Sequence, residues 1–87
     1  MGFKYILTKD ARHDLRGLAQ QITKRILKKI LWIATQNDPV SFGKMLKNSP
    51  AGDVRFRVGD YRVIASIDYQ KETLTITAIG HRREIYR

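Results

Sequence analysis

The chain of 87 residues is long enough for one domain and too short for two, and its 43% hydrophobic residues suit a packed core. It contains no cysteine, which excludes disulfides and thiolate metal sites, and its two histidines are too few to build a zinc site alone. Lys and Arg number 17 against 8 Asp and Glu, and the net charge of +9 exceeds the magnitude of about 2–8 usual for a soluble small domain. Such an excess points to a polyanion, nucleic acid above all, or to an acidic protein partner.

The sequence contains no run of about 18 apolar residues, so we expect no membrane-spanning segment. The first ten residues lack the long apolar stretch and the small-residue cleavage site of a signal peptide. A cytoplasmic protein is therefore expected.

The N-terminal half predicts one strand followed by two helices. Apolar side chains alternate through residues 3–7, which is the period of a strand. Thr8 is suited to cap a helix, and apolar residues at helical spacing extend over residues 9–19. A second apolar stripe predicts a longer helix over residues 21–35, which has to end before Pro39 because proline cannot continue a helix.

Basic residues and a tryptophan occupy the side of the second helix that lies away from its apolar stripe. Arg25, Lys28 and Trp32 share this side. Trp32 either covers the flank of the helix or marks a protein-binding surface, because tryptophan is enriched at interface anchors.

The C-terminal half predicts strands. Residues 40–46 suit one more helical turn, and apolar residues then alternate over residues 54–58 and 61–67 on either side of a two-residue turn. A last strand over residues 74–78 places Ala78 on the core face. We therefore predict one α+β domain over residues 1–87, with both helices on one face of a largely antiparallel sheet and a polar face left open.

The hairpin turn fixes which residues of its two strands face each other. If Gly59 and Asp60 form the turn, Arg57 lies directly opposite Arg62, and Arg55 lies nearby on the same face. Like charges directly opposite are destabilising, whereas guanidinium groups match phosphate oxygens well. The arrangement therefore indicates a phosphate site, unless the side chains splay into water, where screening weakens their repulsion.

The residues after Gly80 add more basic and aromatic groups. His81, Arg82, Arg83 and Tyr86 follow one another closely. Basic groups mixed with an aromatic side chain suit single-stranded RNA, whose bases stack and whose phosphates pair with cations. Cleavage of RNA by its own 2′-hydroxyl needs cations around the phosphorus and groups that move two protons.

Two stretches resemble those of a known family. The hairpin over residues 55–64, together with Leu46, Lys47 and Pro50 before it, resembles the central hairpin of RelE-type toxins, and residues 80–87 resemble their ending. The order of the predicted elements matches along nearly the whole chain.

The resemblance implies the toxin of a type II toxin–antitoxin system. Such toxins enter the ribosomal A site and cleave messenger RNA by attack of the 2′-hydroxyl, without a metal or other cofactor. It also implies a cognate antitoxin, expected to be acidic and partly disordered, which inhibits the toxin and with it represses their own promoter DNA. Arg25, Lys28 and Trp32 are candidate antitoxin contacts.

The resemblance further implies roles for single residues. Arg62 would bind the scissile phosphate, Arg82 would stabilise the transition state or the leaving group, and Tyr86 would orient or activate the 2′-hydroxyl. The positions expected to touch RNA without a catalytic role are Lys47, Arg55, Arg57 and Arg83.

One departure from the family pattern concerns the general base. Well-known members carry lysines on the strand before the hairpin, where this chain has Asp53 and Arg55. Arginine stays protonated and is a poor base. The proton therefore passes to Tyr86 or to His81, because histidine serves as a general base in many enzymes, or cleavage rests on charge stabilisation alone.

Two other functions remain open. A ParE-type toxin that inhibits DNA gyrase would share the fold, although the joint presence of Arg62, Arg82 and Tyr86 favours RNA cleavage. A non-catalytic module that binds RNA or antitoxin and acts as a co-repressor would bind RNA, in a strongly salt-dependent way, without cutting it.

Overall fold

The computed structural model describes residues 2–85, which form one five-stranded sheet with helices packed against it. The strands follow the order β1-β5-β4-β3-β2, with β1 parallel to β5 and the other neighbours antiparallel. The predicted α+β class is confirmed. The elements are β1 (Lys4–Leu7), α1 (Lys9–Arg16), α2 (Gln20–Ala34), the 3₁₀ turn η1 (Pro39–Phe42), β2 (Lys44–Met45), β3 (Val54–Val58), β4 (Tyr61–Asp68), β5 (Thr73–His81) and α3 (Arg82–Ile85).

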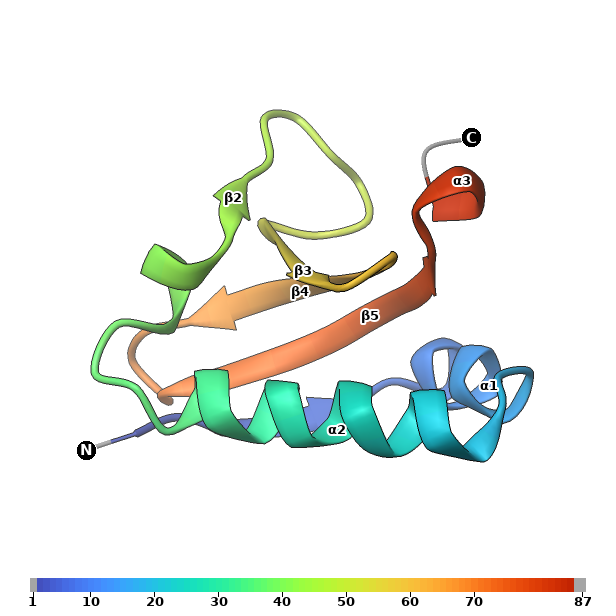
Figure 1. Ribbon diagram of the computed structural model, residues 1–87. Helices are drawn as coiled ribbons and strands as arrows, with labels where there is room; N and C mark the ends of the chain where they lie inside the picture. Colours follow the sequence, from blue (N-terminus) through green and yellow to red (C-terminus); the bar gives the residue numbers. More distant parts are fainter. Residues whose placement is uncertain (1, 86–87) are drawn as a thin grey trace.

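The core lies between the sheet and the two N-terminal helices. Figure 1 shows α1 and α2 on one side of the sheet, with the loop after β2 and α3 on the other. The apolar stripe of α2 is buried at Ile26, Ile30 and Ile33, each no more than 1% exposed. These isoleucines pack in one cluster with alternate residues of β3 and β4, including Phe56 and Val63, so the helices cover one face as the periodicity predicts.

The helix ends follow from their capping residues. Thr8 is the N-cap of α1, and its hydroxyl accepts the Ala11 amide at 3.1 Å, as predicted. The helix ends earlier than predicted, at Arg16, because Gly17 closes the last turn by donating to the Asp14 carbonyl at 3.2 Å. The second helix begins and ends within a residue of its predicted bounds.

The β3–β4 hairpin has the predicted register. Arg57 lies opposite Arg62, and Arg55 lies opposite Ile64. Gly59 adopts φ of 59°, which is the conformation required at the first central position of a two-residue hairpin turn.

A β-bulge in β5 changes which residues reach the core. The register between β4 and β5 shifts at Ile64/Ala65, so Ile64 pairs with Ala78 and Ala65 with Ile76, leaving Thr77 as the extra residue. Ile79 is therefore the buried residue at 4% exposure, and Ala78 lies on the opposite face. The prediction that Ala78 faces the core is wrong, because alternation cannot anticipate a one-residue insertion.

The face opposite the helices is only partly open, contrary to the prediction. The loop over residues 46–53 crosses it and covers Ile64, which is 8% exposed. Gly52 lies so close to β4 that a Cβ there would come within 2.9 Å of an Ile64 methyl carbon. The Thr77 hydroxyl donates to the Ala51 carbonyl, and the Asp53 amide donates to the Ala65 carbonyl at 2.9 Å, which fastens the loop to the sheet.

Two segments differ in extent from their predicted form. The helical turn predicted within residues 40–46 is the 3₁₀ turn η1, which ends at Phe42, and the two-residue strand β2 follows it. The last strand is longer than predicted, and the residues that follow it begin α3. No helix among residues 2–85 is long and apolar enough to cross a membrane.

Candidate phosphate-binding site

Three arginines of the β3–β4 hairpin share the face that lies away from the helices. Arg57 and Arg62 are direct cross-strand partners, and Arg55 lies two positions along β3. On its other side Arg62 pairs with Gly80 of β5, which has no side chain. No side chain of β5 therefore stands beside Arg62 at this position.

These arginines surround a shallow hollow of about 310 Å³. Lys44 contributes a further cation, because β2 pairs with β3 so that Lys44 lies opposite Arg55. The residues that line the hollow are Phe42, Gly43, Lys44, Arg55, Arg57 and Arg62. Lys44 and Phe42 were not predicted, and only the pairing of β2 with β3 brings them here.

The hairpin turn itself holds the Arg62 side chain. Its Nη1 donates to the carbonyl oxygens of Gly59 and Tyr61, both at 2.9 Å. Hydrogen bonds from a charged donor are stronger than neutral ones, so the two carbonyls fix the guanidinium against the turn. The carbonyl dipoles also offset part of its repulsion with Arg57, which explains how two facing arginines are tolerated.

Arg82 is tied to the same turn from the other side. Its backbone amide donates to the Asp60 carbonyl at 2.8 Å, and its Nε lies 4.0 Å from the Asp60 carboxylate. The two side chains are 52% and 69% exposed, so this ion pair is weak. The fold brings Arg82 to the turn that carries Arg62, although Arg82 does not line the hollow.

His81 lies on the other face of the sheet. It pairs with Tyr61, and the two rings meet edge to face with centroids 5.5 Å apart. Its neighbour Gly80 pairs with Arg62, so the alternation of β5 separates the His81 ring from the arginine face. Its Nδ1 accepts the Arg83 amide at 3.2 Å.

The other predicted site residues lie outside the hollow. Lys47 is exposed on the loop over residues 46–53, and Arg83 is exposed on α3. Asp53 accepts the Ile67 amide at 3.0 Å and so helps to hold this loop. Tyr86 lies outside the described residues.

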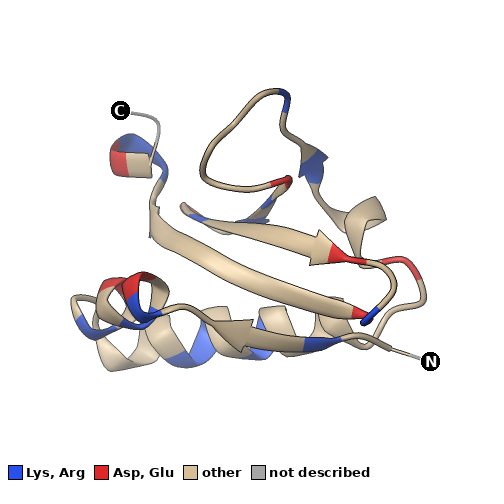
Figure 2. Ribbon diagram, turned by 180° about the vertical axis from the view of Figure 1, so that it is seen from behind, with Lys and Arg blue, Asp and Glu red and all other residues tan. Residues whose placement is uncertain are grey.

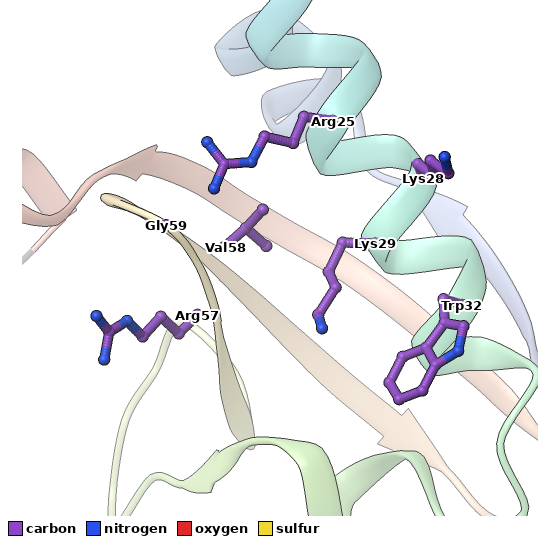
Figure 3. A pocket seen from close by; sticks show the side chains of 7 residues that line it. All are labelled: Arg25, Lys28, Lys29, Trp32, Arg57, Val58 and Gly59. Carbon is purple, nitrogen blue, oxygen red and sulfur yellow. The ribbon is translucent and has the colours of Figure 1, made fainter.

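A second hollow, of about 480 Å³, separates α2 from the edge of β3. Figure 3 shows Arg25 pointing toward the turn at Gly59, whereas Arg57 points away from α2. The three predicted antitoxin contacts all line this hollow, whose residues are Arg25, Lys28, Lys29, Trp32, Arg57, Val58 and Gly59.

Positive charge therefore gathers on both sides of β3. Figure 2 shows basic segments on α2 and on β2. Residues of α2 line one hollow, and Lys44 of β2 lines the other. Among residues 2–85, no group of three or more His, Asp and Glu side chains is placed to hold a metal ion.

Comparison with known proteins identifies the class. A family model described as the ParE toxin of the type II toxin–antitoxin system parDE matches residues 5–86. Toxin RelG of Mycobacterium tuberculosis is 31% identical over 87 residues, which is all of this chain and 99% of that protein. The chain therefore belongs to the RelE/ParE family of toxins of type II toxin–antitoxin systems.

Solved structures agree with this assignment. The toxin–antitoxin complex RelBE2 of Mycobacterium tuberculosis contains a chain that matches with a TM-score of 0.83 and 28% identity, over 94% of this chain and 100% of that one. A chain of the archaeal RelE–RelB complex of Pyrococcus horikoshii matches with a TM-score of 0.75 and 25% identity, over 97% and 99% of the two chains.

Proposed function

We propose that this toxin is an endoribonuclease that cleaves messenger RNA in the ribosomal A site and so inhibits translation. The observation that supports it best is the hollow on the sheet, where Arg55, Arg57 and Arg62 meet Lys44 around a space that suits one phosphodiester. Preorganised cations stabilise the charge that develops on a phosphoryl group without reorganisation during the reaction.

The reaction needs no protein nucleophile. The 2′-oxygen of the RNA forms a bond to phosphorus while the bond from phosphorus to the 5′-oxygen breaks, which leaves a 2′,3′-cyclic phosphate and a 5′-hydroxyl. One proton leaves the 2′-hydroxyl and one reaches the departing 5′-oxygen. Arg62 and Arg57 neutralise the phosphate, and Arg82, beside the turn, stabilises the leaving oxygen.

The residue that accepts the proton is Tyr86 in this proposal. Arginines are poor bases, and His81 lies on the opposite face of β5 from the arginines, with Nδ1 already accepting an amide. His81 instead supports the start of α3 through the Arg83 amide. Arg83 and Lys47, both exposed and outside the hollow, would contact the RNA away from the cleaved bond.

The partner that inhibits the toxin is an acidic antitoxin, partly disordered until it binds. The cations of the hollow between α2 and β3, with Trp32 as an apolar anchor, suit an acidic segment that carries apolar side chains. The two solved relatives above are complexes named for a toxin and its antitoxin, which supports this partner. Operator DNA would be bound through the toxin–antitoxin complex.

The test is a cleavage assay on ribosomes programmed with a defined message. We expect position-specific cuts by the wild type and a loss of about 100-fold or more for Arg62→Ala, as for removal of one transition-state donor. Arg12→Ala removes an arginine from the exposed side of α1 and is the matched control for charge. If Arg62→Ala cleaves as fast as Arg12→Ala, Arg62 has no part in the reaction.

A second candidate function is inhibition of DNA gyrase, which the ParE description of the matching family model favours. A gyrase-supercoiling assay with the same two proteins separates the candidates. Inhibition of supercoiling without cuts in the message would replace the nuclease proposal. Salt-dependent RNA binding with neither activity would leave the co-repressor function.

A further inference from the structure

An aromatic pair lies exposed at the end of α2. Trp32 is 45% exposed and Phe42 is 47% exposed, and their rings meet edge to face with centroids 4.9 Å apart and an interplanar angle of 76°. Lys29 places its ammonium 4.8 Å from the centroid of the Trp32 ring. Large apolar side chains are usually buried, so an ordered aromatic pair outside the core calls for a function.

The position of Phe42 is fixed by the backbone around it. Within η1 the Ser41 amide donates to the Asp38 carbonyl at 3.1 Å, and after it the Gly43 amide donates to the Val40 carbonyl at 3.0 Å. A Cβ on Gly43 would come within 2.7 Å of the Phe56 ring, so only glycine lets the chain approach β3 this closely. The approach holds Phe42 at the edge of the arginine hollow.

Phe42 lines the same hollow as Arg55, Arg57 and Arg62. Among residues 2–85 it brings the only ring to the hollow; the other lining side chains are cationic, and Gly43 has none. An exposed ring beside arginines is the combination with which proteins bind single-stranded nucleic acid, because the base stacks on the ring and its phosphate pairs with the cations.

We propose that Phe42 is a base-stacking subsite for single-stranded RNA, on which one base rests while an adjoining phosphate lies among the arginines. This inference rests on the proposed RNA function and extends it to a residue that determines how the substrate is held. Trp32 is a positioning residue, because it supports the Phe42 ring from the side of α2 and does not line the arginine hollow.

The chemistry of the hollow favours a nucleotide over a peptide as the occupant. A nucleotide supplies an aromatic face and an anion together, which matches one ring next to four cations. An apolar peptide would bury cationic groups without pairing them, which is unfavourable.

The chain has one tryptophan, so its fluorescence reports on the surroundings of Trp32, which include Phe42. The probe is a three-nucleotide adenosine RNA at low salt, compared with versions in which one nucleotide lacks its base. We expect binding to change Trp32 fluorescence, and Phe42→Ala to weaken binding by about 5- to 150-fold, the range for loss of one stacked base. Removal of the stacked base should weaken binding of the wild type and leave binding of Phe42→Ala unchanged.

Two variants separate stacking from simple apolar contact. Phe42→Tyr keeps a ring and should bind as the wild type does, whereas Phe42→Leu keeps apolar bulk without a ring and should bind as Phe42→Ala does. Met45→Ala removes another exposed apolar side chain, 54% exposed, that does not line the hollow, and should have no effect. Full affinity in Phe42→Leu would overturn the inference in favour of an apolar partner such as a peptide.

The outcomes also separate this inference from the proposed function. If Arg62→Ala abolishes cleavage but Phe42→Ala binds RNA as the wild type does, the stacking subsite is refuted and the nuclease stands. If binding depends on the base and on Phe42 but programmed ribosomes are not cut, the subsite stands and the nuclease is refuted. If the wild type binds none of the RNAs at low salt, the stacking subsite is refuted, and the cleavage assay alone decides the nuclease.

Discussion

At the scale of single residues, the central feature is the way the fold tolerates Arg57 opposite Arg62. The Arg62 guanidinium donates to two carbonyls of the turn, and its other cross-strand neighbour is Gly80. A cation held by backbone carbonyls keeps its position when a ligand is absent, so little conformational entropy is lost when a phosphate binds. The turn therefore both connects β3 to β4 and holds Arg62 in position for the candidate site.

Gly59 of the hairpin turn should contribute to stability through its backbone conformation. Gly59→Ala should lower the free energy of unfolding by about 1–2 kcal/mol, because alanine is disfavoured at the left-handed φ of 59°. Urea denaturation measures the change. Gly59→Asn is the control, since asparagine tolerates this conformation better, and it should be the more stable of the two variants. Equal stability of the two would show that backbone conformation does not decide the effect.

At the scale of elements, α1 is joined to the edge of β5 by one side chain. The Asp14 carboxylate accepts the Ile79 amide at 3.0 Å, beyond the point where β1 stops pairing with β5. The amide of this buried residue would otherwise lie unpaired, because β1 pairs only as far as Ile76. The contact holds the part of β5 that carries Gly80 and leads to Arg82.

We expect Asp14→Ala to lower the free energy of unfolding by about 1–3 kcal/mol, the cost of leaving a buried donor without its acceptor. Amide hydrogen exchange at Ile79 should accelerate more than exchange at Val63 in the centre of the sheet. His13→Ala, an exposed neighbour on α1, is the control and should change neither quantity by much. Unchanged exchange at Ile79 in Asp14→Ala would contradict the role of this contact.

At the scale of the whole molecule, the net charge of +9 predicts how RNA binding depends on salt. If the cations of the hollow hold one phosphodiester and exposed basic residues such as Lys47 and Arg83 hold about three more, the logarithm of the association constant should fall against the logarithm of the salt concentration with a slope of about −3. Removal of Arg62 should make the slope shallower by about 0.7–1. A titration of short RNA at several salt concentrations measures both.

Phe42→Ala provides the contrast for that titration. Stacking releases no counterions, so this variant should weaken binding without changing the slope. A slope near zero in the wild type would show that the excess charge does not contact RNA. A change of slope in Phe42→Ala would show that loss of the ring also displaces the cations.

The sequence by itself determined the layers and the hairpin. Alternation and helical spacing are local signals, and they predicted one buried face for α2, β3 and β4. The two-residue turn also fixes which residues pair between positions 54 and 65, so the pairing of Arg57 with Arg62 could be predicted from the sequence. Much of the candidate site could therefore be predicted from patterns between residues that are close together in the sequence.

Only the tertiary structure decided the features that depend on residues far apart in the chain. The bulge at Thr77 moved Ile79 into the core, and pairing of β2 with β3 brought Lys44 and Phe42 to the arginines. The face on which His81 lies follows from the register of β5 against β4. A one-residue insertion reverses the face of every later side chain, and a two-residue strand leaves no periodic signal, so neither could be predicted before distant segments were packed together.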